Sequence, residues 1–215
     1  MTVTCVVFDL DGTLVDSSPD IAAALNVAFA SLGVRELTAP ETLAMLGGGP
    51  RVLVRQATAA VGYAADDAEI DRLVEVYTVA YRANPVNLTA FFADAAEALP
   101  RLHAQGLRLG VCTNKRTDIA EQVLEHLGVR ELFGSIVGSE KASKSKPDPA
   151  HLLETLAELG EAPAGCLYVG DTKIDADTAK AAGVDYVHVS WGHPLDAQTE
   201  IDTFAELAPM AATPR

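Results

Sequence analysis

Short apolar runs alternate with segments of helical periodicity along most of the chain, and this alternation predicts the fold. Continuous runs rich in β-branched residues indicate strands buried on both faces. The strands are expected at residues 3–8, 107–112, 135–137, 166–169 and 186–189. The helices are expected at residues 93–104, 117–127, 149–159 and 174–182. Strands and helices in alternation predict an α/β fold, a parallel sheet with helices on both faces.

One long stretch interrupts this alternation and contains no expected strand. A helix should begin at Ser17 or Ser18, because a hydroxyl can cap it and Pro19 is tolerated in the first turn. The further helices expected in the stretch are 42–46, 51–61 and 67–82. We interpret the stretch as an inserted all-helical subdomain at residues 17–84. Residues 1–16 and 85–215 would then form the core domain.

Composition narrows the classes of partner. The 215 residues suffice for one sizeable domain with a smaller insert. A net charge of −14 argues against nucleic acid and against an anionic membrane surface, both of which need a basic footprint. No stretch approaches the ~20 apolar residues that span a bilayer. The expected protein is cytoplasmic, a monomer or homodimer, whose partner is a small molecule.

The cysteines support the same expectation about compartment. Cys5, Cys112 and Cys166 are widely spaced, odd in number and show no CxxC pattern. This spacing is unlike that of a disulfide framework or a zinc site. We interpret them as buried free thiols in a reducing compartment.

The end of the first strand carries the first candidate chemistry. Its apolar run stops at Asp9, and Asp11 and Gly12 follow. Two carboxylates at the end of a buried strand are costly to desolvate unless a positive charge lies between them. A hard cation such as Mg²⁺ would satisfy both. Alone, the pattern also fits an ordinary acidic turn, because Asp-Gly is a common turn pair.

Other polar residues follow later strands or lie between them. They are Thr113, Asn114, Lys115, Lys146, Asp171 and Asp175. The carboxyl ends of parallel strands meet at one edge of a sheet, so these residues should lie near Asp9 and Asp11. Taken singly, each has an ordinary structural role, such as a helix cap or a solvated lysine. Together they supply a nucleophile, an acid, a hydroxyl and an ammonium, as phosphoryl transfer requires.

These motifs, in this order, resemble those of the haloacid dehalogenase superfamily of phosphatases. The motifs are Asp-Leu-Asp-Gly-Thr at 9–13, Thr113, Lys146-Pro-Asp-Pro, and Gly170-Asp171 with Asp175. The resemblance covers nearly the whole chain and implies a Rossmann-like core with an inserted helical cap. The phosphoglycolate phosphatases are the most similar subfamily, through residues 113–115, 47–54 and 190–192. Lys173 departs from the small residue expected after Gly-Asp-Thr.

The resemblance implies a Mg²⁺-dependent phosphomonoester hydrolase. Asp9 would attack phosphorus to form an aspartyl-phosphate, and Asp11 would act as general acid and then general base. The metal ligands would be Asp9, the main-chain carbonyl of Asp11, and Asp171. The substrate would be a small phosphorylated metabolite, with 2-phosphoglycolate favoured.

The resemblance also implies which residues bind the substrate. Thr113, the Asn114 amide and Lys146 would hold the phosphate oxygens, and Asp175 would orient Lys146 or a metal-bound water. Arg51 or Lys115 could pair with a substrate carboxylate. The alternative for Arg51 is an exposed arginine at a helix start, and for Lys115 a solvated lysine in a first helical turn.

Other reactions use the same motifs. A phosphomutase would return the phosphoryl group to a sugar, and a pyrophosphatase would need only a different cap contact. A dehalogenase has no use for an acid at Asp11, and phosphonate hydrolysis would need a cap lysine, which residues 17–84 lack. A more distant alternative is a non-enzymatic phosphoacceptor module in signalling.

Overall fold

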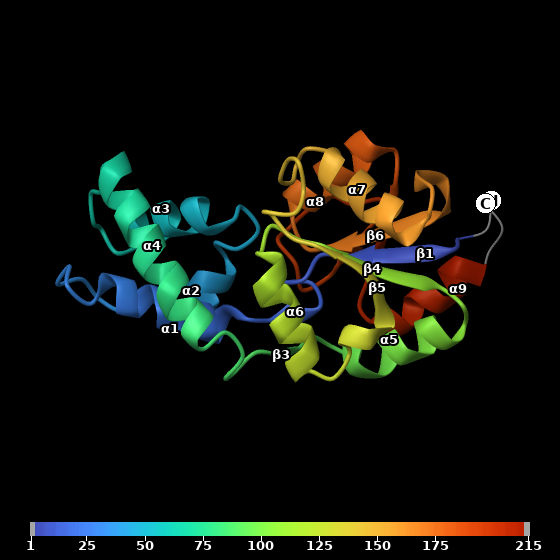
Figure 1. Ribbon diagram of the computed structural model, residues 1–215, viewed down its shortest axis with the longest axis horizontal. Coiled ribbons are helices and arrows are strands. Elements are labelled where there is room, and N and C mark those ends of the chain that lie inside the picture. Colours follow the sequence, from blue (N-terminus) through green and yellow to red (C-terminus); the bar gives the residue numbers. More distant parts are fainter. Residues whose placement is uncertain (1–2, 213–215) are drawn as a thin grey trace.

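A parallel sheet forms the centre of the structure, a computed structural model that describes residues 3–212 (Figure 1). Its strands are β1 (Cys5–Phe8), β4 (Arg108–Cys112), β5 (Phe133–Val137), β6 (Cys166–Gly170), β7 (Asp185–Val189) and β8 (Glu200–Ile201). They lie in the order β5-β4-β1-β6-β7-β8, and each neighbouring pair is parallel. The predicted Rossmann-like sheet is confirmed, and β1 lies between β4 and β6.

Helices cover both faces of this sheet, as the sequence predicts. Figure 1 shows α7 (Ala150–Leu159) and α8 (Lys173–Ala182) on one face. On the other face lie α5 (Ala95–Ala104), α6 (Thr117–His126) and α9 (Leu207–Ala212). Every residue of β1 is fully buried between these layers, which explains its uninterrupted apolar sequence.

A group of four helices lies at one end of the molecule, away from the sheet (Figure 1). It consists of α1 (Ser18–Phe29), α2 (Ala39–Leu43), α3 (Pro50–Ala60) and α4 (Asp67–Ala83), and α4 packs on α1 and α3. Within residues 17–84, all of which the structure describes, there is no strand, as expected. The helix expected at 42–46 instead begins three residues earlier, because Thr38 and Glu41 form a reciprocal capping box.

Two short strands were not predicted, and they lie where the chain enters and leaves the group of four helices. β2 (Val15–Asp16) precedes the four helices and β3 (Ala90–Phe91) follows them. They pair antiparallel, with Val15 opposite Phe91 and Asp16 opposite Ala90. The sequence also gives no expectation for β8 or α9. A two-residue strand is too short to show a periodic signal, so sequence patterns miss it.

Two expectations about composition can be compared with the structure. Cys5, Cys112 and Cys166 are free and buried, as predicted. Within residues 3–212, no helix combines the length and the apolar character that crossing a bilayer requires.

Candidate active site

The ends of the central strands bring the predicted site residues to one edge of the sheet. Asp9 directly follows β1, Thr113 follows β4, and Asp171 follows β6. The main-chain N–H of Asp9 donates to Val169 O, so the ladder between β1 and β6 continues to the carboxylate. All three side chains are buried. Parallel pairing therefore fixes three residues that are far apart in sequence on one small surface.

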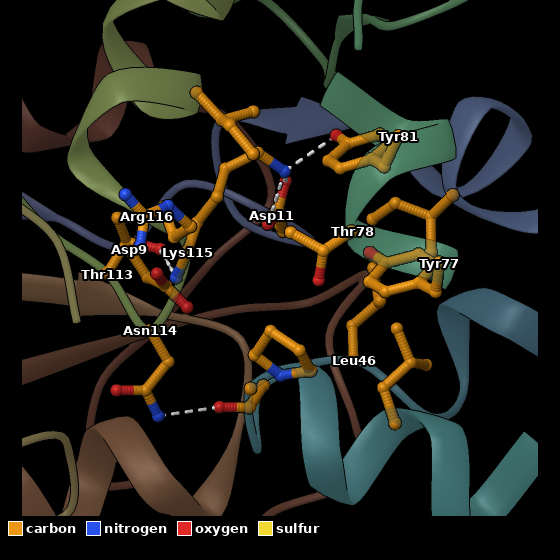
Figure 2. Close-up of a pocket in the computed structure, with 16 residues that line it drawn as sticks. Asp9, Asp11, Leu46, Tyr77, Thr78, Tyr81, Thr113, Asn114, Lys115 and Arg116 are labelled. Atoms are coloured by element: carbon orange, nitrogen blue, oxygen red, sulfur yellow. Dashed lines mark hydrogen bonds and ion pairs between the residues drawn. The ribbon is translucent and has the colours of Figure 1, made fainter. Parts of the chain in front are cut away.

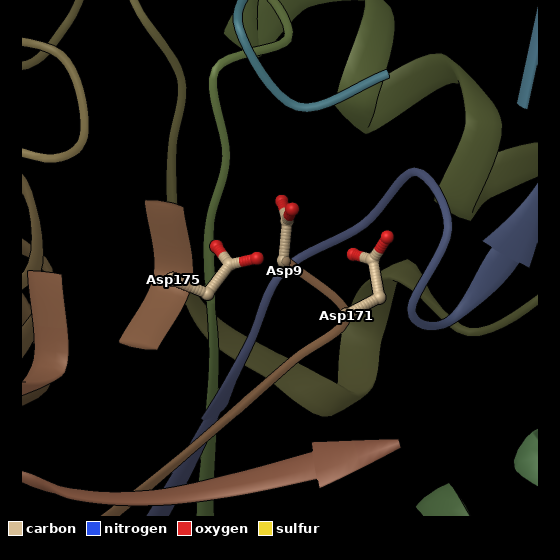
Figure 3. A group of neighbouring side chains, drawn as sticks. All are labelled: Asp9, Asp171 and Asp175. Atoms are coloured by element: carbon tan, nitrogen blue, oxygen red, sulfur yellow. The ribbon is translucent and has the colours of Figure 1, made fainter. Parts of the chain in front are cut away.

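Three carboxylates gather at this edge, those of Asp9, Asp171 and Asp175 (Figure 3). One oxygen from each lies within 4.8 Å of the others. The Lys146 ammonium lies 3.0 Å from Asp9 Oδ1 and 2.7 Å from Asp175 Oδ1. Three carboxylates beside one ammonium leave two negative charges uncompensated, so the cluster suits a divalent cation with oxygen ligands.

The charge imbalance perturbs the ionisation of the cluster. Burial raises the pKa of Asp9 to about 6, although Lys146 acts to lower it. Burial and the neighbouring Asp175 raise the pKa of Asp171 well above its ordinary value. Burial alone would lower the pKa of Lys146, but Asp175 and Asp9 outweigh it and raise the pKa above the ordinary value. A bound cation would oppose the effect of burial and lower both carboxylate pKa values.

Asp175 is the most completely hydrogen-bonded member of the cluster. Its Oδ1 accepts from Lys146 Nζ at 2.7 Å and from the Tyr168 hydroxyl at 3.0 Å. Its Oδ2 accepts from the main-chain N–H and the hydroxyl of Thr172, which closes the capping box of α8. Asp9 and Asp171 have fewer such contacts, and a role for Asp175 in orienting Lys146 stays a prediction.

The loop after β1 packs closely on Asp171. Thr13 Oγ1 donates to Asp171 Oδ1 at 2.8 Å. Gly12 has φ +86°, and a Cβ at this position would lie 2.4 Å from Asp171 Oδ2. Both the backbone conformation and the close approach therefore require glycine. The cluster fits Mg²⁺ by its donor set, although it contains Asp175, which was not among the predicted ligands.

A buried histidine lies beneath Lys146. The main-chain N–H of Lys146 donates to His151 Nδ1 at 3.3 Å, so Nε2 carries the hydrogen and donates to Val137 O at 3.0 Å. His151 is fully buried on α7. Burial, and secondarily the Lys146 charge, lowers the pKa of His151 from 6.5 to about 4.

We expect His151 to destabilise the fold in acid. Its folded-state pKa lies below the ordinary value, so the unfolded chain takes up a proton that the folded protein excludes. Above pH 6.5 the free energy of unfolding does not depend on His151, and as the pH falls from there towards 4 proton uptake by the unfolded chain lowers it. The expected loss between about pH 7.5 and about pH 5 is about 2 kcal/mol. Urea unfolding of wild type and of His151→Gln at both pH values measures this loss of unfolding free energy. An equal loss in the two proteins would contradict the prediction.

Asn114 connects the helical group to the loop that carries Lys146. Its Nδ2 donates to Gly47 O at 2.9 Å and to Lys146 O at 3.2 Å, and its Oδ1 accepts from Lys146 N at 3.0 Å. The side chain is therefore a brace between two loops. Contact between the Asn114 main-chain amide and a phosphate stays a prediction.

The Asp11 carboxylate is held apart from the three-carboxylate cluster. Lys115 Nζ lies 2.8 and 2.9 Å from its two oxygens, and Ser17 Oγ donates to Oδ1 at 2.5 Å. The predicted hydroxyl cap of α1 is therefore wrong, because Ser17 precedes the helix but makes no cap hydrogen bond. A solvated Lys115 is also wrong, since its side chain is 4% exposed.

A pocket opens beside these residues (Figure 2). The sheet edge contributes Asp9, Asp11 and Thr113 to its lining, and the helical group contributes apolar side chains, among them Leu46 and Tyr77. The pocket therefore lies between the sheet and the four helices.

The two predicted specificity residues lie in different places. Lys115 lines the pocket, whereas Arg51 is not among the lining residues. Arg51 is half exposed and pairs with Asp71 at 2.8 Å and with Asp67 at 3.3 Å. This geometry agrees with the alternative of an exposed arginine at a helix start.

Sequence reasoning missed several further lining residues, among them three with polar groups beside the predicted ones. Arg116, Tyr77 and Tyr81 all line the pocket. The tyrosines lie on the apolar stripe of α4, which predicts burial but not what the stripe faces. Arg116 follows the Thr113-Asn114-Lys115 motif directly, and its place next to that motif was the available signal.

Comparisons with known proteins agree with this geometry. The family model described as haloacid dehalogenase-like hydrolase matches residues 6–189. A phosphoglycolate phosphatase of Cereibacter sphaeroides is 43% identical over 188 residues, which are 87% of this chain and 85% of that protein. One of Rhodospirillum rubrum is 37% identical over 98% of this chain and 91% of its own length. The crystal structure of a predicted phosphoglycolate phosphatase from Haemophilus somnus superposes with a TM-score of 0.88 at 27% identity, covering 98% of each chain.

Proposed function

The chain belongs to the haloacid dehalogenase-like hydrolases and is a phosphoric monoester hydrolase, and on this premise we propose a Mg²⁺-dependent reaction through a phosphorylated Asp9. The observation that supports this proposal best is the position of Asp9. Its carboxylate lines the pocket, lies 3.0 Å from Lys146 and belongs to the cluster of three buried carboxylates.

Asp9 is the proposed nucleophile. The N–H of Leu10 and the Lys146 ammonium both contact its Oδ1, so we assign the attack on phosphorus to Oδ2. A bond from Oδ2 to phosphorus forms as the bond to the leaving oxygen breaks. We propose that Asp9, Asp171 and the Asp11 carbonyl hold Mg²⁺, which when bound neutralises charge on the phosphoryl oxygens.

Asp11 is the proposed acid and base. In the first step its carboxyl proton passes to the leaving alkoxide, which departs as an alcohol. In the second step Asp11 takes a proton from water as that water attacks phosphorus. The bond between phosphorus and Asp9 then breaks, which releases phosphate and restores the Asp9 carboxylate and the protonated Asp11.

The remaining residues bind and enclose the substrate in this proposal. Thr113, the Asn114 amide and Lys146 hold the phosphate oxygens, and Asp175 keeps Lys146 directed at Asp9. We propose that residues 17–84 act as a cap domain over the core formed by 1–16 and 85–215. Closure of the cap would exclude bulk water during attack.

The proposed substrate is a small phosphorylated metabolite, with 2-phosphoglycolate the first candidate. The support is that the relatives from Cereibacter sphaeroides and Rhodospirillum rubrum carry the name phosphoglycolate phosphatase. Lys115 is buried at the pocket wall, where its ammonium pairs with Asp11.

Phosphate release from a panel of esters tests this proposal. The panel contains 2-phosphoglycolate, sugar phosphates, nucleotides and pyrophosphate, each with Mg²⁺ and with EDTA. We expect release with Mg²⁺ to exceed release with EDTA by at least about 100-fold, because the buried cluster lacks a counter-charge without metal. Metal-dependent release led by another ester would contradict the substrate only, and release that EDTA leaves unchanged would contradict the metal.

A further inference from the structure

Lys115 links the Asp11 carboxylate to a helix of the distant group. Its Nζ lies 2.8 Å from Asp11 Oδ1, 2.9 Å from Asp11 Oδ2 and 2.7 Å from the Tyr81 hydroxyl oxygen (Figure 2). The ammonium has three N–H donors, and these three oxygens are its acceptors. Lys115 follows β4 in the sheet-bearing part of the chain, whereas Tyr81 belongs to the last turn of α4.

The surroundings hold this ammonium in one place. The Lys115 side chain is 4% exposed, and its Nζ lies 4.6 Å from the centre of the Tyr81 ring. Tyr81 is itself 3% exposed, and its ring stacks on Tyr77 at 5.8 Å between centroids. A buried ammonium is stable only with charge and hydrogen-bond partners, so Lys115 depends on both Asp11 and Tyr81.

We infer that Lys115 and Tyr81 are positioning residues for the general acid, and that Tyr81 makes the position of Asp11 depend on α4. This inference rests on the proposed function, in which Asp11 protonates the leaving oxygen. Ser17 at the start of α1 contacts the same carboxylate at 2.5 Å, so two helices of the group reach Asp11. Both contacts require the helical group to lie against the sheet edge, so the position of Asp11 depends on that arrangement.

The identity of the leaving group provides a specific test. An alkoxide is a poor leaving group and needs the Asp11 proton as it departs. A p-nitrophenolate is stable as an anion and departs without a proton. Loss of a positioning residue should therefore slow phosphoryl transfer from an alkyl ester to Asp9 and spare the same transfer from the aryl ester. A defect in nucleophile, metal site or folding would slow both.

The experiment compares kcat/KM for 2-phosphoglycolate and p-nitrophenyl phosphate in Tyr81→Phe and Lys115→Met, because kcat/KM reports the steps up to departure of the leaving group. Tyr81→Phe keeps the ring and removes one acceptor, so we expect about tenfold lower kcat/KM for the alkyl ester. Lys115→Met should lower it by about 100-fold or more. The kcat/KM for the aryl ester should change by less than about twofold in both variants. Asp11→Asn removes the acid itself, so it gives the largest difference between the two esters that loss of positioning can produce.

Matched variants away from the pocket serve as controls. Tyr63→Phe and Lys141→Met alter the same residue types and should leave both activities unchanged, because neither residue lines the pocket. Thermal unfolding of all variants separates a loss of folding from a loss of positioning.

Three results would overturn the inference. Equal loss for both esters would show a general defect. A raised KM for 2-phosphoglycolate with unchanged kcat in Lys115→Met would show that Lys115 binds the leaving group instead. Wild-type protein inactive on both esters with Mg²⁺ would overturn the proposed function, and this inference with it.

Discussion

Asp9→Asn is expected to abolish phosphate release, by at least about 10⁴-fold, while the protein stays folded. The amide has the shape of the carboxylate but cannot attack phosphorus. The variant should also be more stable than wild type without Mg²⁺, by about 1–3 kcal/mol at pH 7. The reason is that burial raises the pKa of Asp9 to about 6, so its charged form is disfavoured in the folded state.

Steady-state phosphate release and thermal unfolding, each with and without Mg²⁺, measure these effects. Mg²⁺ should stabilise wild type more than the variant, because a cation compensates a charge that the variant lacks. Asp196→Asn, an exposed position, is the matched control and should behave as wild type. Normal turnover in Asp9→Asn would exclude Asp9 as the nucleophile.

Lys146→Met should produce the second largest change and should affect stability as well as activity. The Lys146 ammonium contacts Asp9 and Asp175, and all three groups are buried. Removing one partner of a buried ion pair leaves uncompensated charge and costs about 3–5 kcal/mol. Phosphate release should fall to background, because the variant also loses the proposed contact of Lys146 to the phosphoryl oxygens.

The pH dependence of unfolding distinguishes this cause from a packing defect. Without Lys146 the carboxylates have still higher pKa values in the folded state, so the folded variant takes up protons more readily than the unfolded chain. Its stability deficit against wild type should therefore be largest at neutral pH and shrink as the pH falls towards 5. Lys144→Met removes an exposed lysine and is the control. A deficit independent of pH would point to lost packing.

The sequence predicts the sheet, and the edge of it that carries the candidate site residues, from local patterns alone. Apolar runs that stop at Asp9, Thr113 and Asp171 mark where buried strands emerge, and parallel pairing aligns their ends. The inference needs only local pattern and topology. The helical stretch is predicted on the same basis, because α4 has a clear apolar stripe.

The contacts of Asp11 lie beyond such reasoning. Ser17 has the local signature of a helix cap, and Lys115 that of a solvated first-turn lysine. Both side chains instead contact the Asp11 carboxylate, because α1 and α4 bring a hydroxyl and a tyrosine to the sheet edge. Local sequence contains no information on how a distant helix packs there. Asn114 is a similar case, since its brace to Gly47 depends on a loop 67 positions away in the chain.

The pairing of β2 with β3 brings the two ends of the helical stretch close together. The chain leaves the sheet-bearing part at Val15–Asp16 and returns at Ala90–Phe91, in two strands that pair directly. Opposite Cα atoms in such a pair lie about 5 Å apart. A two-residue turn can span that gap, so the helical stretch is an insert whose two ends lie next to each other. Exchange of residues 17–84 would keep the sheet and its edge but would remove the contacts of Ser17 and Tyr81 to the pair of Asp11 and Lys115, so a replacement stretch must supply equivalent contacts.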